Sequence, residues 1–218
     1  MEQTDIWSIN PSTSATFFKT AATVTGGVFP RALTLTNTNP VVAKEGAGYR
    51  LVFTSAGNDS GITFTINGAV VGNLVDGASA VNYPEVVTGG NAGAVNSVYY
   101  YSRIDSIVIS GAAAGTLSVG TTGSLALPRC RVKGFYIVGG AGAGSLKIDR
   151  HTQTTNPGTP TTVTPGIADN VLDVTTPAGA TLTQFLSLPG QGILTGQQQN
   201  DFSVVVATAI TDYTLFCG

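Results

Sequence analysis

Short runs in which apolar and polar residues alternate, separated by clusters of turn residues, recur along most of this sequence. The strictest run is Ile62–Ile66, whose three apolar residues occupy every second position, and Thr116–Gly120 follows the same rule. Such alternation predicts strands with one buried face, because successive side chains of a strand point to opposite sides. Strands that recur every 8–12 residues or so are typical of β-sandwiches and barrels. The pattern therefore predicts an all-β fold.

Two glycine-containing segments predict tight turns. The pair Asn67–Gly68 directly follows the strand Ile62–Ile66, and Asn-Gly is a strong signal for a two-residue hairpin. The run Gly139–Gly144 follows an expected strand, as a dinucleotide-binding loop would. No helical pattern comes after it, because Leu146–Ile148 continues as a strand, and a phosphate then lacks the helix N-terminus that usually binds it. We therefore expect a hairpin turn at Gly139–Gly144 as well.

The domain organisation follows from a change in composition. The chain has 218 residues, a length that suits one large β domain or two small ones. A segment of Thr, Gly and Ser at Thr121–Ser124 separates the two series of expected strands. We predict two small β-sandwich or barrel modules, over residues 31–123 and 124–218. Residues 1–30 show little alternation, and we expect them to form an extended N-terminal arm.

The expected arm is rich in aromatic residues. Trp7, Phe17, Phe18 and Phe29 all lie within its first 30 positions. Exposed aromatics at this density reduce solubility unless another surface buries them. We therefore name these four as candidate interface residues, to be covered by a neighbouring subunit or by a larger assembly. The alternative is that they complete the core of the first module.

A second candidate interface is the run Tyr99, Tyr100 and Tyr101. In a regular strand Tyr99 and Tyr101 share one face, and Tyr100 lies on the other. We expect one face to belong to the core. The other is expected to present an interface anchor, because tyrosine is enriched at protein interfaces.

The sequence offers few residues for catalysis or metal binding. His151 is the only histidine, so a site built from several histidines is ruled out, and the Gly-x-Ser-x-Gly nucleophile motif does not occur. The aspartates follow no calcium-loop spacing, and Asn58–Ser60 is expected to form an Asx turn. Cys130 and Cys217 fit no metal-ligand spacing, so we expect two free thiols. We predict no catalytic residue, no cofactor and no metal ion.

Charge and hydropathy argue against two classes of partner. Charged residues make up only 10% of the chain and the net charge is −2, so a basic stripe for nucleic acid is not expected. There is no run of 18 apolar residues, so no transmembrane helix is expected. Residues 1–10 contain Glu2 and Asp5 and lack a hydrophobic core. This predicts the absence of a secretory signal and assembly in the host cytoplasm.

Several blocks of the sequence resemble a module of structural proteins from tailed bacteriophages. Three blocks occur here in the order that the module has, namely Leu51–Ile66, Val87–Gly93 and Ile104–Gly120. The second half is similar to small phage proteins through Arg131–Gly140, Leu188–Leu194 and Tyr213–Gly218. One segment departs from the pattern, because the apolar run Ala69–Val75 stands where related modules often have a charged hairpin.

The resemblance implies a non-enzymatic virion protein. The function expected from it is that of a capsid decoration, or cement, protein, which binds the major capsid protein on the outer capsid surface as a homo-oligomer, with a trimer as the expected state. The alternative is a tail or head fibre component that binds a host-surface receptor. A virion-borne depolymerase is the remaining, enzymatic class, and no pair of acids among clustered aromatics supports it.

Overall fold

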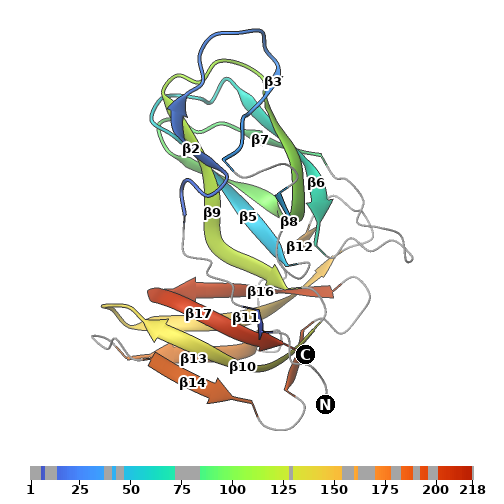
Figure 1. Cartoon of the computed structure of the whole chain (residues 1–218), viewed down its shortest axis with the longest axis vertical. Helices are drawn as coiled ribbons and strands as arrows, with labels where there is room; N and C mark the ends of the chain where they lie inside the picture. The colour runs from blue at the N-terminus through green and yellow to red at the C-terminus, as the bar shows by residue number, and fades with distance from the viewer. Residues whose placement is uncertain are drawn as a thin grey trace. The chain divides into compact units, whose positions relative to one another are not determined.

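The computed structural model describes residues 6–7, 14–36, 41–42, 47–71, 84–127, 130–153, 160–161, 170–177, 183–188, 192–195 and 201–217. Every regular element in these ranges is a β-strand (Figure 1), so the prediction of an all-β fold is confirmed. The chain divides into two compact units. Unit 1 consists of Met1–Ser12, Lys44–Ala47 and Gly123–Gly218, and unit 2 of Thr13–Ala43 and Gly48–Thr122.

The strands pair antiparallel throughout. Those of unit 2 are β2 (Lys19–Thr23), β3 (Arg31–Ala32), β4 (Val41–Val42), β5 (Gly48–Ser55), β6 (Thr63–Val70), β7 (Glu85–Thr88), β8 (Ala94–Ile109) and the first part of β9 (Thr116–Leu127). Those of unit 1 are β1 (Ile6–Trp7), the end of β9, β10 (Cys130–Gly139), β11 (Gly144–Gln153), β12 (Pro160–Thr161), β13 (Asn170–Thr176), β14 (Thr183–Ser187), β15 (Ile193–Thr195), β16 (Asp201–Thr208) and β17 (Ile210–Cys217). The boundary expected at residues 123–124 falls inside β9, which continues without interruption.

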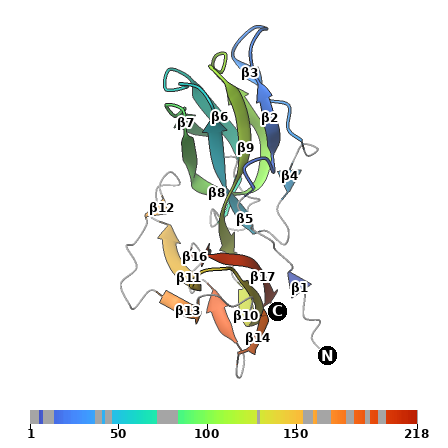
Figure 2. The ribbon, with the colours of Figure 1, turned by 90° about the vertical axis from the view of Figure 1, so that its left-hand side faces the viewer.

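The 16-residue strand β8 organises unit 2. Its second half pairs with β6, from Tyr101 to Ile109, and one edge of its first half pairs with β5. The short strands β3 and β4 pair with its second half. Beyond β5 the sheet continues to β9 and β2, and beyond β6 it ends at β7. In Figure 2, β7 and β2 accordingly lie on opposite sides of the unit.

The core of unit 2 lies between the strands that flank the two halves of β8. Phe53 on β5 stacks on Phe64 on β6, with ring centroids 4.6 Å apart and an interplanar angle of 12°. Both rings are buried, and aromatic pairs stabilise a core beyond the area that they bury. The same cluster contains Leu51, Ile66, Ile104, Ile107, Ile109, Leu117 and Val119.

The predicted hairpin at Asn67–Gly68 is wrong, because both residues lie inside β6. Asn67 is opposite Ser106, Gly68 is opposite Ile104, and the skipped Asp105 marks a β-bulge. A Cβ at Gly68 would overlap the carbonyl oxygen of Arg103. Glycine is therefore required here by a close approach of two backbones and not by a turn.

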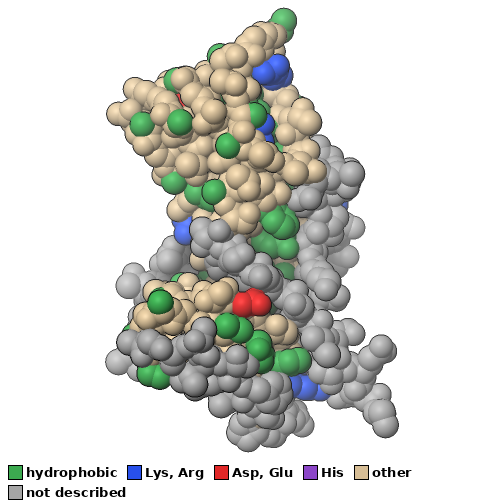
Figure 3. Space-filling model, turned by 60° about the vertical axis from the view of Figure 1, so that its left-hand side comes forward, with side chains coloured by type: hydrophobic (Ala, Val, Ile, Leu, Met, Phe, Trp, Pro, Cys, Tyr) green, Lys and Arg blue, Asp and Glu red, His purple; other side chains and the backbone are tan. Residues whose placement is uncertain are grey.

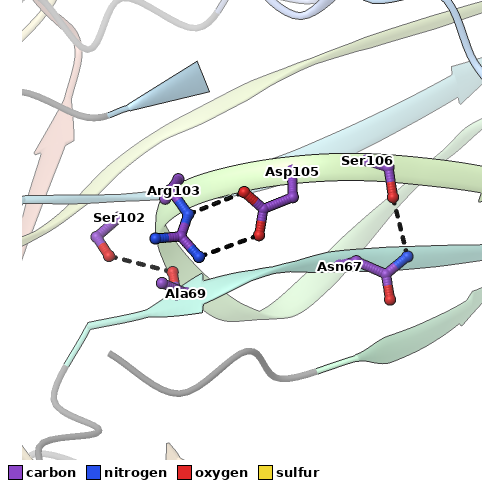
Figure 4. A network of polar contacts seen from close by, with 6 residues as sticks. All are labelled: Asn67, Ala69, Ser102, Arg103, Asp105 and Ser106. Carbon is purple, nitrogen blue, oxygen red and sulfur yellow. Dashed lines mark hydrogen bonds and ion pairs between the residues drawn. The ribbon is translucent and has the colours of Figure 1, made fainter. Parts of the chain in front are cut away.

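Polar side chains line β6 and β8 around this bulge, as Figure 4 shows. Asn67 Nδ2 lies 3.1 Å from Ser106 Oγ, and Ser102 Oγ donates to the carbonyl of Ala69 at 3.2 Å. Arg103 forms a bidentate pair with Asp105, with its Nε 2.8 Å from Oδ1 and its Nη2 3.2 Å from Oδ2. The divergent run Ala69–Val75 begins inside β6, which ends at Val70, and most of the run lies outside the described residues.

Replacing Gly68 by alanine is expected to destabilise unit 2 by about 1–3 kcal/mol, because the added methyl group forces β6 and β8 apart. Gly61 provides a matched control, since a Cβ there meets no atom within 4 Å. The Gly61→Ala variant should stay within about 0.5 kcal/mol of the parent chain. Denaturant unfolding of both variants measures the difference. Equal stabilities would contradict the close approach of Gly68 to Arg103.

Residues 14–30, the main described part of the expected arm, belong to unit 2. β2 pairs with β9, and the Phe18 N–H donates to the Val119 carbonyl at 2.9 Å. The Phe18 side chain is fully buried in the core of unit 2, and Phe29 packs against that core. Phe18 and Phe29 thus fit the alternative given for these aromatics, namely that they complete the core of the first module. The rest of the expected arm, apart from β1, lies outside the described residues.

The Phe18→Ala substitution should therefore destabilise the isolated chain by about 3–5 kcal/mol, the usual range for a buried phenylalanine. The neighbouring Phe17 is 38% exposed, and its replacement by alanine should cost only about 1 kcal/mol. Thermal unfolding at several protein concentrations checks this. A Phe18→Ala variant that unfolds like the parent but no longer self-associates would restore the assembly role.

Unit 1 contains two sheets. One has the order β1-β17-β10-β14, with β15 also on β10, and the other contains β11, β16 and the end of β9, with β12 and β13 on β11. The side chains buried between these strands include Leu127, Val132, Phe135, Ile137, Leu146, Ile148, Val205, Tyr213 and Leu215.

The hairpin expected at Gly139–Gly144 is also wrong. β10 and β11 belong to different sheets, so this segment passes from one sheet to the other. It packs against the connection between β16 and β17, where Ala209 has a φ of 51°. The Gly140 N–H donates to the Ala209 carbonyl at 3.1 Å, and a Cβ at Gly140 or Gly144 would lie within 3 Å of that oxygen. The glycines thus allow two crossing connections to meet backbone to backbone.

Candidate functional site

An irregularity in β8 produces the most distinctive cluster of buried polar groups in unit 2. Arg50 is opposite Tyr100 and Val52 is opposite Asn96, so the three residues Ser97–Tyr99 of β8 stand against the single residue Leu51 of β5. A bulge of this kind takes backbone N–H groups out of the regular ladder. Buried N–H groups must then find other acceptors.

Ser97 supplies one replacement for the interrupted ladder. Its side chain is fully buried, and its Oγ accepts a hydrogen bond from the Leu51 N–H at 2.9 Å. The same hydroxyl donates to the Tyr99 carbonyl at 2.9 Å. Arg50 Nε donates to the Ser97 carbonyl at 2.7 Å from the neighbouring strand. Side chains therefore bridge β5 and β8 where backbone pairing is interrupted.

Glu85 on β7 supplies the remaining acceptors. Its Oε1 accepts from the Val98 N–H at 2.5 Å, and its Oε2 accepts from the Tyr99 N–H at 3.2 Å and from the Tyr101 hydroxyl at 3.1 Å. Among the described residues β7 pairs only with β6. The carboxylate of Glu85 thus joins β7 to the first half of β8 without a backbone ladder. We call the bulged residues Ser97–Tyr99, together with Glu85 and Tyr101, the bulge site.

Burial governs the ionisation of this site. Glu85 is only 7% exposed, and desolvation raises the pKa of its carboxyl group, although three hydrogen bonds and the positive charge of Arg50 act in the opposite direction. Burial and the neighbouring Glu85 also raise the pKa of Tyr101 above its ordinary value, so its hydroxyl keeps the proton that it donates. The arrangement suits holding strands together, because every oxygen of the carboxylate already accepts a hydrogen bond.

The tyrosine run keeps the expected alternation on its core face, because Tyr99 and Tyr101 both belong to the core cluster of unit 2. Tyr100, on the other face, is also buried, and its role as an interface anchor stays a prediction. Val98 is exposed, at 48%, and Val86 on β7 is 63% exposed. Both valines lie at the bulge site, because the Val98 N–H donates to Glu85 and Val86 is the residue after Glu85 in β7.

The candidate interface residues near the N-terminus are separated by the fold. Phe17 and Phe18 form a cluster with Tyr49, with ring centroids 4.9–5.9 Å apart. Phe29 lies under the guanidinium group of Arg31, which is 5.0 Å from the ring centre. Trp7 is in β1, opposite Leu215 of unit 1, and its side chain lies outside the described residues. Of these aromatics, Phe17 alone is seen to keep a large exposed area.

A second buried carboxylate ties three loops of unit 2 together. Asp59 is 2% exposed, and its Oδ1 accepts from the Ala114 N–H at 2.7 Å. Its backbone N–H donates to the Gly90 carbonyl at 2.8 Å, and its carbonyl accepts from the Ile62 N–H at 3.0 Å. The preceding Asn58 forms the expected Asx turn, because its Oδ1 accepts from the Ser60 N–H at 3.1 Å. We call this arrangement the loop junction.

The described residues contain no group of three or more His, Cys, Asp or Glu side chains placed to bind a metal ion. In the same ranges no helix is long and apolar enough to cross a membrane. The side chains of His151, Cys130 and Cys217 lie outside the described residues. The backbone places Cys217 opposite Val132, two residues from Cys130 on the adjacent strand. The presence of two free thiols stays a prediction.

Comparisons of the chain with protein-family models, with curated proteins and with solved structures find no match. Any function proposed for it therefore rests on its own residues.

The raised pKa of Glu85 gives the stability of unit 2 a definite dependence on pH. The folded chain keeps the carboxyl proton at a higher pH than the unfolded chain, whose glutamate pKa is 4.5. Protonation therefore favours the folded state, and the stabilisation is lost as the pH rises through the folded pKa. Each unit of pKa difference corresponds to about 1.4 kcal/mol.

The measurement compares the free energy of unfolding of the parent chain with that of Glu85→Gln between neutral pH and pH 4.5. The parent should gain stability relative to the variant as the pH falls. Because Gln does not titrate, the difference between the two curves isolates Glu85 from Arg50 and from the other acids. Parallel curves would show that the environment does not raise the pKa of this carboxyl group.

Proposed function

We propose that the chain is a non-enzymatic structural protein of a tailed-phage virion, and specifically a capsid decoration protein that binds the major capsid protein on the outer surface as a homo-oligomer. The supporting observation is that the three blocks that resemble phage structural modules form one junction in space. Asp59 of the first block binds Gly90 of the second and Ala114 of the third.

The three blocks supply most of the framework of unit 2. Leu51–Ile66 covers most of β5 and the start of β6, Val87–Gly93 covers the end of β7 and its loop, and Ile104–Gly120 covers the second half of β8 and part of β9. Glycines allow the loops to touch, since a Cβ at Gly57 or Gly115 would overlap the backbone of the other loop. The residues that carry the resemblance therefore lie in one connected part of unit 2, which supports the proposal.

The surface supports a role in passive attachment. Only 10% of the residues are charged, and the face in Figure 3 shows few charged side chains among many other polar and backbone atoms. The exposed Val86, Val98 and Phe17 offer small apolar contacts of the kind that bury readily against a partner. Individually weak contacts suffice on a capsid, because an oligomer that binds several equivalent sites gains strength through multivalency.

Copy number in the virion tests this proposal. A decoration protein occupies symmetry-related positions over the whole shell, so quantitative mass spectrometry of purified particles should find on the order of hundreds of copies. Electron microscopy should place extra density on the outer face of the capsid. A few to dozens of copies at a vertex or on the tail would favour the fibre component instead. Absence from the particle would contradict a virion role altogether.

A further inference from the structure

A hollow opens between β2 and the segment that begins with β3 in unit 2. Its volume is about 170 Å³, and it is lined by Lys19, Thr23, Val24, Arg31, Ala32, Leu33 and Thr34. Val24 and Leu33 are almost fully buried and form an apolar floor, whereas the two threonines are exposed. The lining thus combines two positive charges, two hydroxyl groups and an apolar surface, and it contains no acid.

The fold explains why the two segments separate here. β2 pairs with β9 and β3 pairs with β8, so neither strand forms a ladder with the other. At one end the Thr36 N–H donates to the Phe18 carbonyl at 2.6 Å, and the Thr20 N–H donates to Thr36 Oγ1 at 3.1 Å. At the other end the loop between β2 and β3 is fixed by a bond from the Ala113 N–H to the Val24 carbonyl.

The two positive charges of the hollow have no acidic partner among the described residues. The ion pairs in these ranges are Arg103–Asp105 and Lys147–Asp173, and neither involves the hollow. Arg31 is supported on one side by an aromatic ring. Its guanidinium carbon lies 5.0 Å from the centre of the Phe29 ring. A cation fixed before binding loses little conformational entropy when an anion arrives.

The contrast with the bulge site indicates that the hollow lacks an acidic group. There the gap between two strands is closed by a carboxylate of the chain itself, that of Glu85. Here the gap stays open and presents Lys19 and Arg31. Arginine binds carboxylate and phosphate groups through paired hydrogen bonds, and a neighbouring lysine adds charge.

We propose that the hollow binds one sugar residue that carries an anionic group, either a carboxylate or a phosphate. Arg31 and Lys19 bind the anionic group, Thr23 and Thr34 bind sugar hydroxyls, and the apolar floor contacts the ring. The hollow of about 170 Å³ has room for the sugar ring, because a cavity of about 150 Å³ accommodates benzene, and its open side leaves space for the substituents. The site goes beyond the proposed virion function and does not depend on attachment to a capsid.

Titrations followed by amide chemical shifts test the proposal. D-glucuronate and glucose 6-phosphate are added separately to the full chain at constant ionic strength, with glucose as the neutral probe and inorganic phosphate as the bare anion. At least one anionic sugar should saturate the amides of Thr23 and Thr34 with a dissociation constant of about 1 mM or below. Glucose should bind at least tenfold more weakly. The stronger of the two anionic sugars identifies the group as carboxylate or phosphate.

Variants separate a built site from general charge attraction. Arg31→Gln and Lys19→Gln should each weaken binding at least tenfold, whereas Arg103→Gln, which removes an arginine of the same unit, should leave it unchanged. Arg31→Lys keeps the positive charge and more of the native packing but lacks the paired donors. Its loss of affinity should therefore lie between that of the parent chain and that of Arg31→Gln. No saturation by either sugar, equal binding by Arg31→Gln, or phosphate binding as tight as that of glucose 6-phosphate would overturn the proposal.

Discussion

Unit 2 depends on the way in which the carboxylate of Glu85 satisfies backbone groups that the bulge of β8 leaves without strand partners. β8 pairs with β5 along its first half and with β6 along its second, and the bulge at Ser97–Tyr99 interrupts its ladder with β5. A buried N–H without an acceptor costs about 1–3 kcal/mol. Glu85 removes two such costs at once, for Val98 and Tyr99, and in doing so joins β7 to β8.

The same physical rule explains the loop junction and gives the hollow its character. Asp59 accepts a backbone N–H from a distant loop, so a carboxylate again replaces strand pairing where the chain is irregular. Close approaches at Gly57 and Gly115 let those loops meet without side chains between them. The gap beside β3 lacks such a carboxylate and exposes Arg31 instead. The carboxylate of Glu85 fills the gap at the bulge site, whereas the gap beside β3 suits an acidic group that belongs to a ligand.

Local pattern was enough to predict the strands but not their connections. The alternation in Ile62–Ile66 follows from one buried face, and β6 contains most of this run. The turn predicted at Asn67–Gly68 is wrong because glycine favours tight turns and also permits two backbones to touch. Only the position of Arg103 on the neighbouring strand distinguishes a turn from such a close approach. The alternation correctly placed Tyr99 and Tyr101 on one core face, but no local pattern marks the bulge at Ser97–Tyr99 beside them. Glu85 was missed because its partners lie 13–16 residues away.

The central place of β8 has a consequence for how the protein is made. β3, β4, β5 and β6 all pair with residues 94–109, and β2 needs β9, so the early strands of unit 2 have their partners late in the chain. During synthesis these strands leave the ribosome before any partner exists for their backbone groups. Contacts between residues that lie far apart in the sequence form slowly, and the unpaired strands are prone to associate with other chains in the meantime. The unit therefore closes as a whole once β8 and β9 have emerged, and not strand by strand.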